Sequence, residues 1–132
     1  MNTIISEILS NTKTIAVVGL SAKPERPSYD VALYMQKQGF RIIPVNPNEE
    51  IILGEKSYPN LSAIPFSIDL VNVFRKSQDC SEIVTEAAKV RAKHVWLQLG
   101  VVNLEAQAIA TNAGINFVMD RCLKIEHFLI KK

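Results

Sequence analysis

The residues with the clearest chemical potential follow an apolar run near the start of the chain. Residues 14–18 are mostly apolar and β-branched, and the loop after them reads Gly19, Leu20, Ser21 and Ala22. A glycine here lets the backbone turn sharply and approach a pyrophosphate, which backbone N–H groups and a helix N-terminus can bind. Ser21 adds a hydroxyl donor. The stretch therefore predicts a phosphate-binding turn after the first strand of an α/β sheet, with a plain strand-to-helix turn as the alternative.

This turn departs from the G-x-G-x-x-G fingerprint of dinucleotide-binding proteins. Ser21 stands at the second glycine position and Pro24 at the third. The acidic residue that would hold an NAD ribose after the second strand is also missing, because residues 45–47 read Val-Asn-Pro. These departures argue against NAD binding of the fingerprint type.

Four basic residues flank predicted strand ends and could bind phosphate groups. Lys23 and Arg26 follow the first strand, and Arg75 and Lys76 follow the third. Arginine binds a phosphate through a bidentate fork, and lysine binds it as a point charge. Each pair alone is compatible with a solvated loop, but their joint placement favours an anionic ligand.

Two other strand ends supply candidate walls for a ligand site. The run Pro44-Val45-Asn46-Pro47 is rigid and has few free donors. It suits an adenine or pantetheine edge or, alternatively, a tight exit turn. At the end of the fourth strand, the Gln98 amide can bond an amide-bearing ligand, and Gly100 can admit it closely.

Cys122 is the one side chain with reactive potential. It follows Asp120 and Arg121 at the start of a predicted helix. The helix N-terminus and Arg121 could favour a thiolate there; the alternative is a small residue that packs against the sheet. We expect Asp120 to cap this helix. Cys80, by contrast, is expected to begin a helix and pack.

The histidines lie outside the predicted strand-end loops. His94 begins a strand and His127 lies on the last helix, so we expect structural roles for both. The chain shows no Ser-His-Asp order, no H-E-x-x-H motif and no carboxylate pair at a defined spacing. No catalytic residue and no metal site are therefore predicted.

Apolar patterning places these residues on alternating strands and helices. The predicted strands cover about 14–18, 41–45, 69–74, 94–99 and 116–119; the predicted helices cover about 4–9, 29–38, 80–91 and 104–113, with a closing helix after residue 122. Ser28 is the predicted N-cap of the second helix. This alternation predicts a Rossmann-like, doubly wound parallel sheet of about five strands with helices on both faces. The expected strand order is 3-2-1-4-5, with the flavodoxin-like order as the alternative.

The composition predicts one globular domain over residues 1–132. The chain is 48% hydrophobic and 21% charged, with a net charge of +2. Its basic residues are not clustered or interleaved with aromatic residues, which argues against a nucleic-acid partner. No apolar run approaches the roughly 20 residues of a membrane span, and no secretory signal is visible. The two cysteines form no disulfide framework. We expect a cytoplasmic protein without a membrane partner.

Several of these motifs, in order, resemble one known family. The segments are Ala16–Ser21, Pro44–Pro47, Val73–Arg75, Val95–Gly100 and Met119–His127. Together they resemble the CoA-binding domain family of small stand-alone proteins, which is similar to the N-terminal domain of the succinyl-CoA synthetase α subunit. The resemblance runs from about Thr14 to Phe128. It implies a Rossmann-like fold in which CoA lies across the strand ends, with its pyrophosphate near Gly19.

The resemblance also implies roles for individual residues. Gly19, Ser21 and Lys23 would hold phosphates, and Pro44 and Asn46 would border the nucleotide. Phe74 and Arg75 would flank the place where CoA crosses the next strand end. The full candidate set for CoA is Gly19, Leu20, Ser21, Ala22, Lys23, Arg26, Pro44, Val45, Asn46, Pro47, Phe74, Arg75, Lys76, Gln98 and Gly100.

The expected function is binding of CoA or an acyl-CoA by a non-catalytic carrier, sensor or regulatory module. Synthetase activity is not expected, because the synthetase uses a phosphohistidine in a second domain and a partner subunit. One alternative is an enzyme of acyl-CoA or CoA-disulfide chemistry in which Cys122 reacts, for example by a mixed disulfide with CoA. Another is a nucleotide or dinucleotide sensor with the same fold. A homodimer through the apolar C-terminal helix, or a regulatory protein partner, stays open.

Overall fold

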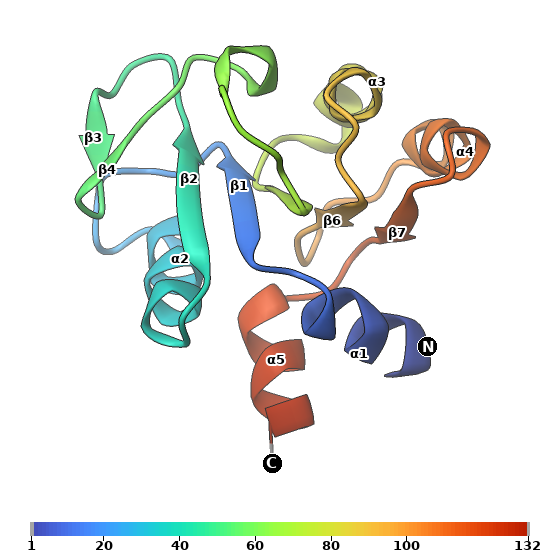
Figure 1. Ribbon diagram of the computed structural model, residues 1–132, viewed down its shortest axis with the longest axis horizontal. Helices are drawn as coiled ribbons and strands as arrows, with labels where there is room; N and C mark the ends of the chain where they lie inside the picture. The colour runs from blue at the N-terminus through green and yellow to red at the C-terminus, as the bar shows by residue number, and fades with distance from the viewer. Residues whose placement is uncertain (1, 132) are drawn as a thin grey trace.

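A computed structural model describes residues 2–131 and contains one five-stranded parallel sheet (Figure 1). Its strand order is β2-β1-β5-β6-β7. The strands are β1 (Thr14–Val18), β2 (Arg41–Val45), β5 (Leu70–Val73), β6 (His94–Leu97) and β7 (Asn116–Val118). All five lie close to the ranges predicted from the apolar runs, and the doubly wound α/β class is confirmed.

The expected strand order is wrong, and the flavodoxin-like alternative is correct. The third long strand, β5, pairs with β1 instead of lying beyond β2. The outer edge of β2 is already occupied by the segment around Tyr58, whose N–H donates to the Pro44 carbonyl at 3.0 Å and whose carbonyl accepts from Asn46 N–H at 2.9 Å. Pro44 has no N–H to donate, and it is tolerated because it lies in this edge strand.

The connection from β2 to β5 replaces a crossover helix with short elements. These are the hairpin strands β3 (Ile51–Ile52) and β4 (Glu55–Lys56) and the 3₁₀ turn η1 (Leu61–Ala63). Asn60 caps η1, since its side chain accepts from Ala63 N–H at 2.9 Å.

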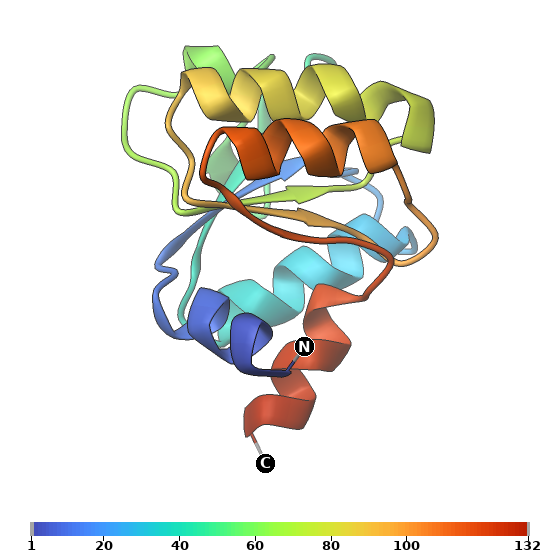
Figure 2. The same ribbon diagram turned by 90° about the vertical axis from the view of Figure 1, so that its right-hand side faces the viewer.

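Helices cover both faces of the sheet (Figure 2). One face carries α1 (Asn2–Ser10), α2 (Pro27–Lys37) and α5 (Leu123–Lys131); the other carries α3 (Cys80–Lys89), preceded by the 3₁₀ turn η2 (Ser77–Asp79), and α4 (Leu104–Asn112). The inner strands β5 and β6 are buried along their whole length, as expected for a parallel sheet with helices on both faces. Within residues 2–131, none of the helices combines the length and apolar character that a bilayer span requires.

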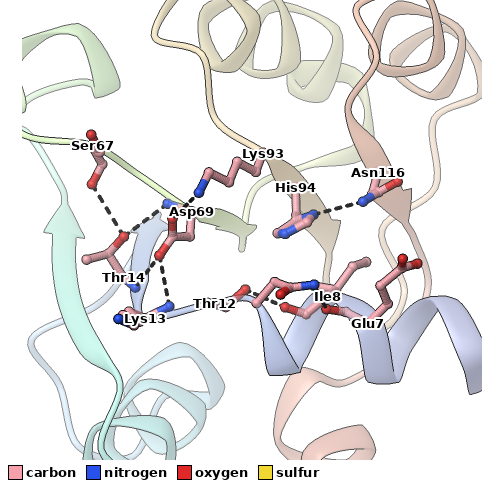
Figure 3. Close-up of polar contacts among 11 residues, drawn as sticks. Glu7, Ile8, Thr12, Lys13, Thr14, Ser67, Asp69, Lys93, His94 and Asn116 are labelled. Carbon is pink, nitrogen blue, oxygen red and sulfur yellow. Dashed lines mark hydrogen bonds and ion pairs between the residues drawn. The ribbon is translucent and has the colours of Figure 1, made fainter.

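The amino ends of the strands are held by a polar cluster at one edge of the sheet (Figure 3). The Asp69 carboxylate accepts hydrogen bonds from the backbone N–H groups of Lys13 at 2.8 Å and Thr14 at 3.1 Å. It also pairs with Lys93 at 3.5 Å. Burial alone would raise the pKa of Asp69, but these hydrogen bonds and the Lys93 charge together leave it lowered. The cluster holds the starts of β1, β5 and β6 together at this edge of the sheet.

Candidate functional site

Two clefts open at the carboxyl ends of the strands and meet at Gly19. The larger cleft, about 750 Å³, lies between the β1, β5 and β6 exits and the starts of α2 and α5. The smaller cleft, about 440 Å³, lies between the β1 and β2 exits and the start of η1. Gly19 and Arg75 line both. The larger cleft is also lined by Ser21, Arg26, Pro27, Ser28, Asp30, Val31, Phe74, Lys76, Gln98, Leu99, Val101, Cys122 and Ile125. The smaller is also lined by Val18, Val45, Asn46, Pro47, Asn48, Pro59, Asn60 and Glu86.

Gly19 is required by its neighbours as well as by its turn. Its φ is +86°, in the left-handed region, and a Cβ atom there would overlap the carbonyl oxygen of Phe74. The exits of β1 and β5 approach this closely because Phe74 N–H donates to the Val18 carbonyl at 2.8 Å. Gly19 N–H in turn donates to the Val45 carbonyl at 3.0 Å. Only glycine fits this junction without displacing the β5 exit.

Ser21 fastens the turn to the first turn of α2. Its backbone N–H donates to Ser28 Oγ, and its own Oγ accepts from Lys23 N–H, both at 3.0 Å. Ser28 therefore does not cap α2 as predicted; Arg26 precedes the helix, and Ser28 lies inside its first turn. The N-terminus of α2, where a helix can bind an anion, consequently lies against the larger cleft.

Asn46 fastens the same turn to the exit of β2. Its Nδ2 donates to the Leu20 carbonyl at 2.9 Å, and its Oδ1 accepts from Asn48 N–H at 2.8 Å. Both ends of the side-chain amide are thus engaged within the protein. Asn46 lines the smaller cleft, but its principal role there is to position the Gly19 turn.

The cations predicted at the strand ends surround Gly19 unevenly. Arg26 and Lys76 line the larger cleft, and Lys23 is exposed just outside it. Arg75 lies between the two clefts and pairs with Asp79 at 3.2 Å. The acidic Asp30, at the cleft wall, is offset by Lys124 of α5 at 2.9 Å.

Part of the lining of the larger cleft is apolar. Val31, Val101 and the exposed side chains of Leu99 and Ile125 contribute to it. Gln98, at the end of β6, is only 7% exposed and lines the same cleft. The larger cleft thus combines cations and the N-terminus of α2 with apolar side chains.

The loop before α5 is held by the β6 exit. Asp120 does not cap the helix as predicted; its carboxylate accepts from Gly100 N–H at 2.8 Å, and the helix begins at Leu123. Arg121 pairs with Glu126 at 3.2 Å. Its guanidinium therefore has a carboxylate partner, whereas the sequence predicted that it would favour a thiolate at Cys122.

Five of the predicted residues line neither cleft. Leu20 is fully buried in the core, and Pro44 is buried within β2; Ala22, Lys23 and Gly100 lie at the rim. The others come together around the two clefts, and whether they bind CoA stays a prediction. Sequence reasoning missed the residues that the helices contribute, notably Val31, Ile125 and Glu86. Helical spacing marks such residues as inward-facing or exposed, but not as cleft-lining.

The remaining candidate groups lie elsewhere. Cys80 packs in the core as predicted, and burial raises the pKa of its thiol. His94 is buried at the amino end of β6, and His127 contacts Tyr34 Oη through Nδ1 at 2.9 Å. Within residues 2–131, no cluster of three or more histidine, cysteine or carboxylate side chains could hold a metal ion.

The chain is similar over nearly its whole length to other small proteins. It is 42% identical over 127 residues to the uncharacterized protein YneT of Bacillus subtilis, covering 96% of this chain and 94% of that one. A solved structure of a hypothetical protein from Pyrococcus horikoshii superposes with a TM-score of 0.96 at 40% identity, covering 100% of this chain and 93% of that one.

Part of the chain is also similar to part of a ligase. The chain is 32% identical over 79 residues to an ADP-forming acetate–CoA ligase of Archaeoglobus fulgidus, covering 58% of this chain but 12% of the ligase. The family model described as a CoA binding domain matches residues 13–128. This range agrees with the extent of the resemblance seen in the motifs. The chain belongs to the CoA binding domain family.

Proposed function

We propose that this protein binds coenzyme A or an acyl-CoA across the carboxyl ends of its strands, as a non-catalytic binding, carrier or sensor module. The observation that carries the proposal is the junction of the two clefts at Gly19, with Arg26, Arg75 and Lys76 around it. CoA has a charged centre between two dissimilar ends, an adenosine and a pantetheine arm. A pair of clefts that meet at a cationic turn matches this division.

Each part of the site suits one part of the ligand. The turn N–H groups, the N-terminus of α2 and Arg26 suit the pyrophosphate. The smaller cleft, with Pro47 and Pro59 in its walls, suits the adenosine. The larger cleft suits the pantetheine arm, whose amides and methyl groups need both donors and apolar surface.

Thermal unfolding in the presence of CoA, dephospho-CoA, NAD and ATP tests this proposal. A ligand that binds only the native state at 100 times its Kd stabilises it by about 2.7 kcal/mol. We expect CoA to raise the melting temperature and NAD to leave it unchanged. Stabilisation by NAD or ATP with none by CoA would contradict the proposal and favour a nucleotide sensor instead.

A smaller effect of dephospho-CoA would show that a cation binds the 3′-phosphate. Arg75→Ala and Lys23→Ala would then locate that cation, because the correct variant abolishes the difference between the two ligands. Lys37→Ala is the matched control, since Lys37 is an exposed cation at the opposite end of α2.

A further inference from the structure

The wall of the larger cleft contains an accessible thiol. Cys122 is half-buried and lines the cleft immediately before α5. Cys80, the other cysteine, is fully buried, and its Sγ donates to the Lys76 carbonyl at 3.5 Å. Of the two, only Cys122 can meet a ligand in this cleft.

Three hydrogen bonds fix the backbone around Cys122. Trp96 Nε1 donates to the Arg121 carbonyl at 2.8 Å, and Leu123 N–H donates to Gln98 Oε1 at 3.3 Å. The Cys122 carbonyl accepts from Glu126 N–H at 3.0 Å, the first turn of α5. The backbone that carries the thiol is therefore fixed at the cleft, next to the side chain of Gln98.

Gln98 supplies an independent sign of a ligand. Its carboxamide orientation is fixed, because Oε1 accepts from Asn72 Nδ2 and from Leu123 N–H, both at 3.3 Å. Among residues 2–131, its Nε2 has no hydrogen-bond partner, although the residue is only 7% exposed and lines the cleft. Nε2 is therefore reachable from the cleft, where an acceptor such as a carbonyl oxygen of a ligand can bind it in place of water.

We propose that Cys122 forms a mixed disulfide with CoA when a CoA disulfide occupies the larger cleft. This inference rests on the proposed binding of CoA and adds to it a covalent bond to Cys122 that forms only with oxidised CoA. The pantetheine arm carries amide carbonyls and ends in sulfur. Gln98 Nε2 can donate to a carbonyl while the sulfur reaches the cysteine on the same wall.

The exchange is balanced without any further reactant. The Cys122 thiolate attacks one sulfur of the CoA disulfide, so a Cys122–CoA sulfur–sulfur bond forms as the bond between the two CoA sulfurs breaks. The second CoA leaves with the electron pair as a thiolate and takes up the proton that Cys122 released. Cys122 is oxidised, the CoA disulfide is reduced, and a small thiol reverses the reaction.

Intact mass measured without reductant tests the exchange. After incubation with CoA disulfide, we expect the wild type and Cys80→Ser to gain one CoA moiety and Cys122→Ser to gain none. Glutathione disulfide at the same concentration should react more slowly, on the order of tenfold, because it is not held in the cleft. Equal rates for the two disulfides, or an adduct that persists in Cys122→Ser, would overturn the proposal.

Two further measurements separate the causes of failure. Gln98→Glu keeps the oxygen that accepts from Leu123 N–H but removes the free N–H donor. This variant should slow capture by about tenfold, the loss of one hydrogen bond. An unchanged rate of capture would overturn the role of Gln98. Stabilisation of the wild type by reduced CoA, with no adduct from CoA disulfide, would overturn capture and leave CoA binding intact. Absence of both would overturn CoA binding as well.

Discussion

At the scale of single residues, Gly19 has the strictest requirement in the site. Its φ of +86° and the nearby Phe74 carbonyl exclude a side chain. We predict that Gly19→Ala lowers the free energy of unfolding by more than the roughly 1–2 kcal/mol expected from the left-handed backbone alone. Gly54→Ala is the matched control, because Gly54 has a φ of +76° but nothing within 4 Å of a Cβ. Urea unfolding measures both losses, and equal losses would contradict the close approach of β1 and β5.

Arg26 is the cation best placed to meet a pyrophosphate, because it lies both at the start of α2 and in the larger cleft. We predict that Arg26→Gln weakens CoA binding by about tenfold or more, the loss of one hydrogen bond to a charged group. Lys37→Gln, at the far end of the same helix, should leave the affinity unchanged. Titration calorimetry gives both values, and equal affinities for Arg26→Gln and wild type would remove Arg26 from the site.

At the scale of elements, β6 begins with a histidine buried beside α1 (Figure 3). His94 is 5% exposed, its Nδ1 lies 3.1 Å from Asn116 Nδ2, and its Nε2 has no partner within residues 2–131. Burial lowers its pKa from 6.5; Asp69 and Glu7 oppose this shift, and Lys93 adds to it. The folded chain therefore favours neutral His94.

This lowered pKa predicts a loss of stability in acid. As the pH falls below 6.5, the unfolded chain takes up a proton at position 94 that the folded chain resists, so the free energy of unfolding decreases. His94→Gln should reduce that slope. The variant should not abolish the slope, because burial and Lys131 also lower the pKa of His127. Urea unfolding at about pH 7.5 and about pH 5.5 measures the slope; an identical slope in wild type and variant would contradict a buried neutral His94.

The strands and helices also show which features of the fold could be predicted from the sequence. Apolar runs located every long strand, since burial on both faces leaves a continuous signal. The order of the strands could not be predicted from local patterns. It depends on whether β5 pairs with β2 or with β1, and the segment around Tyr58 occupies the free edge of β2. The predictions that Ser28 and Asp120 cap helices are wrong for a similar reason, because both side chains accept from backbone N–H groups outside those helices, Ser21 and Gly100.

At the scale of the whole molecule, the two edges of the sheet differ. The Asp69 cluster holds the strand starts together at the amino edge, and the cleft of about 750 Å³ and its smaller neighbour lie at the carboxyl edge. The rule that ligands bind beyond the carboxyl ends of such strands located the loops of the site from sequence. It could not locate Val31 or Ile125, because their placement depends on how α2 and α5 pack against the sheet.

A titration of the ¹⁵N-labelled protein with reduced CoA, followed by ¹H–¹⁵N correlation spectra, tests binding across the two clefts most directly. We predict shifts of the backbone amides of Gly19, Ser28 and Asn48 and of the side-chain amide of Gln98. The amides of Lys13 and Lys93, at the amino edge, should stay in place. Shifts confined to the amino edge, or no shifts with saturating CoA, would contradict CoA binding at the Gly19 junction.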